Sequence, residues 1–111
     1  MNNTAQEKMA LSGECLRMAA ALAKGLADEN RLRIMYYLSN GKKSVSSIVE
    51  ELNLSQPLVS HHLRELKRYL LVNVERNGPF IYYEIVDPEI LNIVQMLGTV
   101  ALELFAKRTT F

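Results

Sequence analysis

The most informative stretch of this sequence is Asn53–Leu70, whose letters are NLSQPLVSHHLRELKRYL. Ser55 suits the N-cap of a helix, and Pro57 follows in the first turn, where a missing N–H costs nothing. Apolar residues then recur every three or four positions, which predicts a helix from Ser55 to about Tyr69 with one buried stripe. The stripe consists of Val59, Leu63, Leu66 and Leu70. His62 borders it, so we expect this imidazole to pack and hydrogen-bond rather than bind a ligand.

The opposite face of the same helix is polar. Its members are Gln56, Pro57, Ser60, His61, Arg64, Lys67 and Arg68. Guanidinium and hydroxyl groups on an exposed helical face can contact both base edges and phosphates in a major groove. The residues near the helix start, Gln56 and Ser60, are those that usually enter the groove most deeply. A solvated charged face is the other interpretation of this pattern.

A second short helix is predicted just before this one, over residues 44–52. Ser44 suits its N-cap, and its inward side chains are expected to be Val45, Ile48, Val49 and Leu52. Only the turn Asn53-Leu54-Ser55 separates the two helices. Two consecutive short helices joined in this way are typical of a helix-turn-helix.

Two more helices are predicted upstream. One covers residues 4–24, with Gly25 expected to end it. The other begins after Asp28, which suits an N-cap, and stops near Asn40–Gly41. Its buried face is expected to consist of Leu32, Ile34, Met35 and Leu38.

Downstream the hydrophobic period changes from helix to strand. Residues 72–76 alternate apolar and polar, 77–79 form a turn, and 80–86 are rich in β-branched and aromatic residues, so a hairpin is predicted. Arg76 and Asn77 at its tip suit phosphates or a minor groove, or an ordinary exposed turn. A last helix over 88–107 follows. The order predicts a mainly α fold with a β-hairpin wing, a single winged helix-turn-helix domain over 1–111.

Composition sets weaker limits. The chain has 111 residues, a formal net charge of +1 and one cysteine, Cys15. One cysteine cannot form an intramolecular disulfide, which together with the lack of a visible signal peptide favours the reducing cytosol. No apolar stretch approaches a membrane-spanning length, so no membrane partner is expected. The segment from Ser55 to Gly78 contains four basic and two acidic residues. This positive excess is small, so DNA affinity would need a dimer to double it.

Two motifs carry a resemblance to a known family. LADENRLRI at 26–34 and LSQPLVSHHL at 54–63 resemble the ArsR/SmtB family of prokaryotic repressors, and the resemblance extends over residues 20–103. It implies a homodimer on an inverted-repeat DNA operator, with the helices at 4–24 and 88–107 pairing across the dimer. The expected interface residues are Leu11, Cys15, Met18, Leu22, Ile90, Val94, Leu97, Ala101 and Leu104. By themselves, these apolar stripes would fit an intrachain core equally well. Leu70 stands where the family usually has glycine.

The metal sites of that family are not matched here. Ser44-Val45-Ser46 replaces a Cys-x-Cys pair and so lacks soft thiolates. A second family site would fall on Asp87, Glu89, Val100 and Glu103, without its histidines. We therefore expect no metal and no cofactor, and acidic residues at 87 and 89 are expected to be helix caps. Cys15 is expected to be a buried hydrophobe, although a redox role across a dimer is an alternative. These residues do not specify an effector.

The sequence predicts a DNA-binding transcription regulator, most simply a repressor, and not an enzyme. No Gly-rich phosphate loop or recognisable catalytic arrangement is present. One alternative is a winged helix that binds other proteins, which the low net charge would suit, and another is a redox- or metal-responsive repressor with a non-standard site. A protein-binding face would favour aromatic anchors over the Ser60, Arg64 and Arg68 found here.

Overall fold

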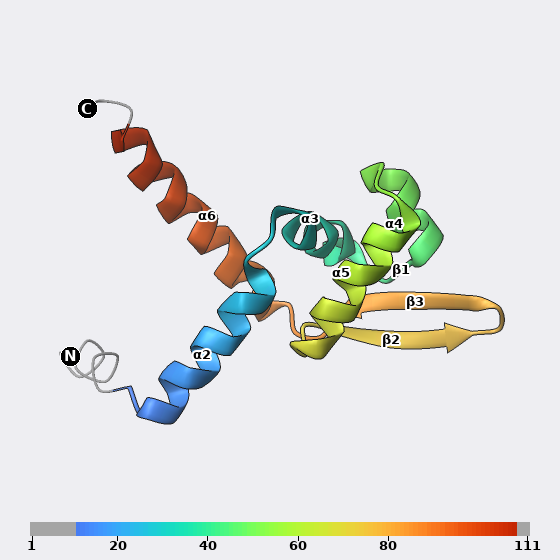
Figure 1. The fold of residues 1–111 in the computed structure, drawn as a ribbon, viewed down its shortest axis with the longest axis horizontal. Coiled ribbons are helices and arrows are strands. Elements are labelled where there is room, and N and C mark those ends of the chain that lie inside the picture. Colours follow the sequence, from blue (N-terminus) through green and yellow to red (C-terminus); the bar gives the residue numbers. More distant parts are fainter. Residues whose placement is uncertain (1–10, 109–111) are drawn as a thin grey trace.

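The computed structural model describes residues 11–108 and has the predicted mainly helical architecture with a β wing (Figure 1). Its elements in chain order are α2 (Gly13–Leu26), α3 (Glu29–Tyr37), the 3-10 turn η1 (Leu38–Asn40), β1 (Lys43–Ser44), α4 (Val45–Leu52), α5 (Gln56–Arg68), β2 (Val72–Asn77), β3 (Phe80–Ile85) and α6 (Glu89–Arg108). Helices α4 and α5 form the helix-turn-helix, and β2 and β3 form the wing. The predicted winged helix-turn-helix is confirmed.

Three predicted helix caps are present. The Asp28 carboxylate accepts the backbone N–H groups of Asn30 and Arg31 at 2.8 and 3.1 Å, at the start of α3. Ser44 and Ser55 cap α4 and α5, each accepting an N–H three residues along the chain. Each cap satisfies donors that the first helical turn leaves unpaired. These caps set where the two helices of the helix-turn-helix begin.

The predictions for the first helix need correction. Within the described residues α2 begins at Gly13, because the Ser12 hydroxyl accepts the N–H of Cys15 at 3.0 Å and caps the helix there. Residues 4–10 of the predicted helix lie outside the described residues. Gly25 does not end the helix, which continues to Leu26. A Cβ at Gly25 would lie 2.9 Å from Cβ of Tyr69, so glycine is required there for close packing.

A third strand was not predicted. The sheet has the order β1-β3-β2, and β1 pairs antiparallel with β3, placing Lys43 opposite Tyr83. Two residues are too short to show an alternating pattern, which explains why the sequence did not reveal β1. In the wing, β2 pairs with β3 from Val72 opposite Ile85 to Asn77 opposite Phe80. The sheet therefore connects the wing to the start of α4.

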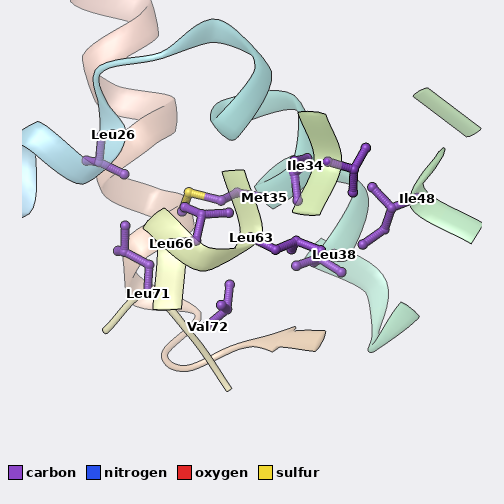
Figure 2. Packing of buried hydrophobic residues seen from close by; sticks show 10 residues of the cluster. Leu26, Ile34, Met35, Leu38, Ile48, Leu63, Leu66, Leu71 and Val72 are labelled. Atoms are coloured by element: carbon purple, nitrogen blue, oxygen red, sulfur yellow. The ribbon is translucent and has the colours of Figure 1, made fainter. Parts of the chain in front are cut away.

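The hydrophobic core lies where α3, α4, α5 and the start of β2 meet (Figure 2). Its members are Leu26, Ile34, Met35, Leu38, Ile48, Val59, Leu63, Leu66, Leu71 and Val72. Three of these, Val59, Leu63 and Leu66, are the predicted stripe of α5, and all three are 0% exposed. The polar face of α5 is consequently held outward by a fully buried opposite face.

Leu70 does not belong to that stripe, contrary to the prediction. Its side chain is 77% exposed and its φ is +63°, because α5 ends before it. The Leu71 N–H binds the carbonyl of Leu66 at 2.9 Å, and the Leu70 N–H binds that of Lys67 at 3.0 Å. This Schellman pattern requires a left-handed residue after the cap, the conformation that glycine adopts most easily. The reversal turns Leu71 into the core in place of Leu70.

Helices α2 and α6 extend away from the core (Figure 1). Helix α6 has no buried residue in the single chain. Large exposed apolar side chains on or beside these helices are Leu11, Leu16, Met18, Ile93, Met96, Leu97, Val100, Leu102, Leu104 and Phe105. The expectation that no apolar stretch has membrane-spanning length is wrong for α6, because this 20-residue helix contains an 18-residue window with a mean hydropathy of 1.4, enough by length and composition alone.

Candidate nucleic-acid interface

The predicted DNA-reading residues lie together on the outer face of α5. Gln56, Pro57, His61, Arg64 and Arg68 are exposed, and Ser60 is half-buried. The predicted face is thus accessible over the whole length of the helix. Ser55 lies just before it, with its hydroxyl 3.3 Å from the N–H of Leu58.

The two arginines of this face differ in their surroundings. Arg68 lies 3.7 Å from the carboxylate of Glu65, an exposed pair that is worth little in water. Its guanidinium also lies 5.7 Å from the ring of Tyr69. Arg64 makes no ion pair with any residue that the structure describes. Its full charge and all its donors are consequently free for a partner.

A hollow of about 470 Å³ lies between α5, the start of α4 and β3, including the end of β3 next to the wing turn. It is lined by Ser44, Val45, Ser46, Val49, Gln56, Ser60, Leu63, Arg64, Pro79, Phe80, Ile81 and Tyr83. Ser46 and Tyr83 were not among the predicted contacts, because only the tertiary packing of α4 and the sheet brings them beside α5. Hydroxyl groups from β1, α4, α5 and β3 therefore line the same hollow as Arg64.

The wing tip borders this hollow on one side only. Pro79 and Phe80 line the hollow, whereas Arg76 and Asn77 are exposed at the end of β2 and do not. Figure 1 shows the wing projecting beyond the helices, so its tip can reach a different part of a long ligand. At its base, Lys42 Nζ lies 2.7 Å from Glu75 Oε1. The hydrogen bond and charge of Glu75 raise the pKa of Lys42.

His62 has the packing and hydrogen-bonding role that was predicted. It is 5% exposed, its Nδ1 accepts from Arg31 Nη1 at 3.5 Å, and its Nε2 lies 3.6 Å from Asp28 Oδ1. Burial lowers the pKa of His62, and Arg31 adds to this, outweighing the opposite effect of Asp28. For Asp28 burial acts to raise the pKa, but the N–H groups of Arg31 and Asn30 and the neighbouring positive charges lower it overall. The imidazole is therefore neutral near pH 7.

No group of three metal-ligating side chains occurs within residues 11–108. Asp87 accepts the N–H of Glu89 at 2.9 Å, so it is a helix cap as predicted. The Glu89 carboxylate accepts from the side-chain amide of Asn92 at 3.2 Å. These acidic groups thus have structural partners within α6.

The predicted dimer residues fall into two groups. Leu11, Cys15, Met18, Leu97 and Leu104 are exposed in the single chain. Leu22, Ile90, Val94 and Ala101 are half-buried, and the first three of these pack against the core. Cys15 was expected to be buried, but it is exposed in the single chain, where no residue within 11–108 covers it.

This arrangement of helix-turn-helix, wing and outward polar helix defines a DNA-binding winged helix-turn-helix protein. Residues 28–74 match the family model of the bacterial regulatory proteins of the arsR family. An HTH-type transcriptional regulator of Methanocaldococcus jannaschii is 36% identical over 80 residues, covering 71% of this chain and 90% of that protein. The transcriptional repressor SdpR of Bacillus subtilis is 37% identical over 62 residues, covering 56% and 69%.

Comparison with solved structures supports the same family assignment. The homodimeric winged helix-turn-helix DNA-binding domain of a possible ArsR-family regulator from Mycobacterium bovis has a TM-score of 0.72 at 28% identity, covering 85% of this chain and 90% of that one. The chain belongs to the ArsR family. It is a DNA-binding transcription regulator and not an enzyme.

Proposed function

We propose that two copies of this chain form a homodimeric repressor that binds an inverted-repeat operator, with α5 of each copy in a major groove. The observation that carries the proposal is the exposed polar face of α5, backed by a fully buried apolar stripe. A helix held in this way presents its polar groups at a fixed angle. The assignment as a repressor is supported by the similarity to SdpR, a transcriptional repressor. We expect the protein in the cytoplasm, where bacterial DNA is found.

The chemistry of the α5 face suits base recognition. An arginine can pair with both acceptors of guanine, and a glutamine can pair with adenine. Arg64 and Gln56 are the exposed residues that supply these groups next to the hollow. Ser60 can donate to or accept from a base or a phosphate. We assign base contacts to these three residues and phosphate contacts to Arg68 and His61.

The other predicted contacts are assigned to the backbone of the DNA. At the start of α5 Pro57 has no N–H, and the Leu58 N–H donates to the Ser55 hydroxyl at 3.3 Å. The backbone N–H of Gln56, between Ser55 and Pro57, is therefore the group to which we assign a phosphate. Arg76 and Asn77 at the wing tip reach toward an adjacent minor groove or its phosphates. Because the chain has a net charge of only +1, a single copy would bind DNA weakly, and a dimer doubles the number of phosphate contacts.

The proposed dimer is supported by the exposed apolar side chains of α2 and α6. A soluble monomer rarely exposes so many large apolar residues on two neighbouring helices. Leu97 and Met18, 53% and 59% exposed, are examples from each helix. The Mycobacterium bovis domain with the same fold is a homodimer. Pairing of α2 and α6 with a second copy would cover these side chains.

Selection of duplexes from a random pool tests the proposal directly. We expect the selected DNA to contain two inverted half-sites about one helical turn apart, centre to centre. Binding to this DNA should exceed binding to scrambled DNA by at least about 10³-fold at moderate salt. Equal affinity for selected and scrambled duplexes would show that α5 does not recognise sequence.

Replacement of Arg64 by alanine should weaken binding to the selected duplex by about 1–3 kcal/mol and relax specificity at one base pair. The control is Lys67→Ala, which removes the same charge from the flank of α5. That change should weaken binding to all sequences about equally and reduce the salt dependence by about one ion. Titrations with the selected duplex and with single base-pair variants make the comparison. Identical effects of the two changes would assign Arg64 to phosphates.

Zinc should not release this protein from its DNA. The positions of the family sites hold Ser44, Ser46 and Val100, none of which is a good zinc ligand. We expect the affinity for the selected duplex to be the same with a chelator and with micromolar zinc. Loss of affinity on zinc addition, abolished by Asp87→Asn or Glu103→Gln, would contradict this proposal.

A further inference from the structure

Arg31 connects three helices. Its Nε donates to the carbonyl of Gly25 at 2.8 Å, and Nη2 donates to that of Lys24 at 3.0 Å. Both carbonyls lie in the last turn of α2, and that of Lys24 also accepts the N–H of Ala27 at 3.3 Å. The third nitrogen, Nη1, faces His62 of α5 at 3.5 Å. One side chain of α3 therefore binds both a helix of the proposed dimer interface and the helix that faces DNA.

His62 completes this cluster from the buried side of α5. Its two ring nitrogens face groups of opposite character, with Nδ1 toward the Arg31 guanidinium and Nε2 toward the Asp28 carboxylate. A neutral imidazole protonated at Nε2 fits this setting, because it offers a lone pair to the guanidinium and an N–H to the carboxylate. Asp28 is itself held by the N–H groups that it caps. The cluster thus specifies one tautomer of a neutral histidine.

We propose that Asp28, Arg31 and His62 form a positioning cluster that holds α5 in its DNA-binding orientation relative to α2, and that protonation of His62 weakens DNA binding. The inference rests on the proposed function, since it assumes that α5 contacts DNA and that α2 lies in the dimer interface. In such a dimer the angle between α2 and α5 determines whether both recognition helices meet successive major grooves.

Protonation changes the cluster at one atom. A proton added to Nδ1 replaces the acceptor that faces Arg31 with a donor, and it places two positive charges about 3.5 Å apart. The attraction between Asp28 and the imidazolium increases, but it does not restore the contact with Arg31. The result is that α5 stays attached to the start of α3 and loses its link, through Arg31, to the end of α2.

The groups around His62 determine where it titrates. They are Asp28 and Arg31 from the start of α3, and His61 and Glu65 from α5 itself. Burial lowers the pKa of His62 from its ordinary value of 6.5, and the positive groups oppose protonation further, against the two carboxylates. The neutral form therefore predominates at pH 7.5, and the protonated form accumulates only below pH 6.5.

The neighbouring histidine provides an internal contrast. The chain contains two histidines, and His61 is exposed on the polar face of α5. A positive charge at this position would lie next to the DNA phosphates and favour binding, whereas the effect proposed for His62 has the opposite sign. His61 is therefore replaced by glutamine in every variant that tests His62.

The test uses the duplex selected at about pH 7.5 and measures its affinity down to about pH 5.5 at constant ionic strength. His61→Gln should lose affinity on acidification, by at most about tenfold per pH unit because one proton is coupled. The double variant His61→Gln/His62→Gln should lose this dependence, so that the ratio of its affinities at about pH 7.5 and about pH 5.5 stays near one, whatever its affinity at the higher pH. Retention of the acid-induced loss in the double variant would overturn the inference.

Asp28→Asn separates positioning from helix capping. Asparagine caps a helix as well as aspartate does, so α3 is preserved while the carboxylate facing His62 is removed. In the His61→Gln background the fall in affinity should then move to lower pH, because the charged imidazole loses its stabilising partner. An unchanged midpoint would contradict the inference, and this holds even if the His62 variant does not fold. Absence of specific binding by the wild type at pH 7.5 would instead refute the proposed function.

Discussion

Leu97→Glu is expected to dissociate the proposed dimer and to weaken binding to the two-half-site duplex by about 10²- to 10⁴-fold, the loss that follows when linked sites act singly. Leu97 lies on the apolar face of α6 and is 53% exposed, so a charge there is tolerated by the single chain. The same charge in an apolar interface would be buried without a partner. Sedimentation and DNA titration at one protein concentration measure both effects.

Thr99→Glu provides the matched control. Two residues along a helix correspond to a rotation of about 200°, so this position lies on the opposite side of α6 from Leu97. Within residues 11–108 its hydroxyl donates to the carbonyl of Gln95 in the same helix, at 3.0 Å. The variant should remain dimeric and bind the duplex as the wild type does. If Leu97→Glu also remained dimeric, α6 would not form the interface, and the proposed assembly would be wrong.

Leu63→Ala is expected to lower the free energy of unfolding by about 2–5 kcal/mol, a large part of the stability of a domain this small. The side chain is 0% exposed and lies in the centre of the core, on the buried face of α5 (Figure 2). Its truncation leaves a cavity behind the helix that faces DNA. Denaturant unfolding at a fixed protein concentration gives the value, since a dimer's stability depends on concentration.

Leu58→Ala is the control for that measurement, because it makes the same change in the same helix. Leu58 is 36% exposed, and its truncation removes less buried surface, so we expect a loss of about 1 kcal/mol or less. The ratio of the two losses tests whether the buried stripe of α5 anchors it. Equal losses would mean that α5 is held by its ends and not by its apolar face.

Much of the fold follows from local patterns. The caps at Asp28, Ser44 and Ser55 are effects within one helical turn, and the stripe of α5 has the helical period over its whole length. The hairpin is similarly a contact between neighbours in sequence. Features of this kind depend only on residues that are close in the sequence, so they were predicted with nearly the right boundaries.

Two of the errors concern contacts between segments far apart in the chain. Gly25 looked like a helix end, but Tyr69 and Leu71 pack against it and leave no room for a side chain. The strand β1 exists only because β3 lies beside it. The error at Leu70 has a local cause, because α5 ends there in a left-handed residue that is not glycine, although its hydrophobic period fits Leu70.

By itself, the sequence determined that this chain forms a helix-turn-helix with a wing and that α5 has one apolar and one polar face. Hydrophobic periodicity and capping are local, so they need no knowledge of the partners. Only the tertiary structure decided that Arg31 joins the end of α2 to His62. Arg31 and His62 lie 31 positions apart in the sequence. The tertiary structure also decided that most apolar side chains of α6 from Ile93 onward are left exposed by residues 11–108. Both are outcomes of packing, which depends on how the elements meet in space.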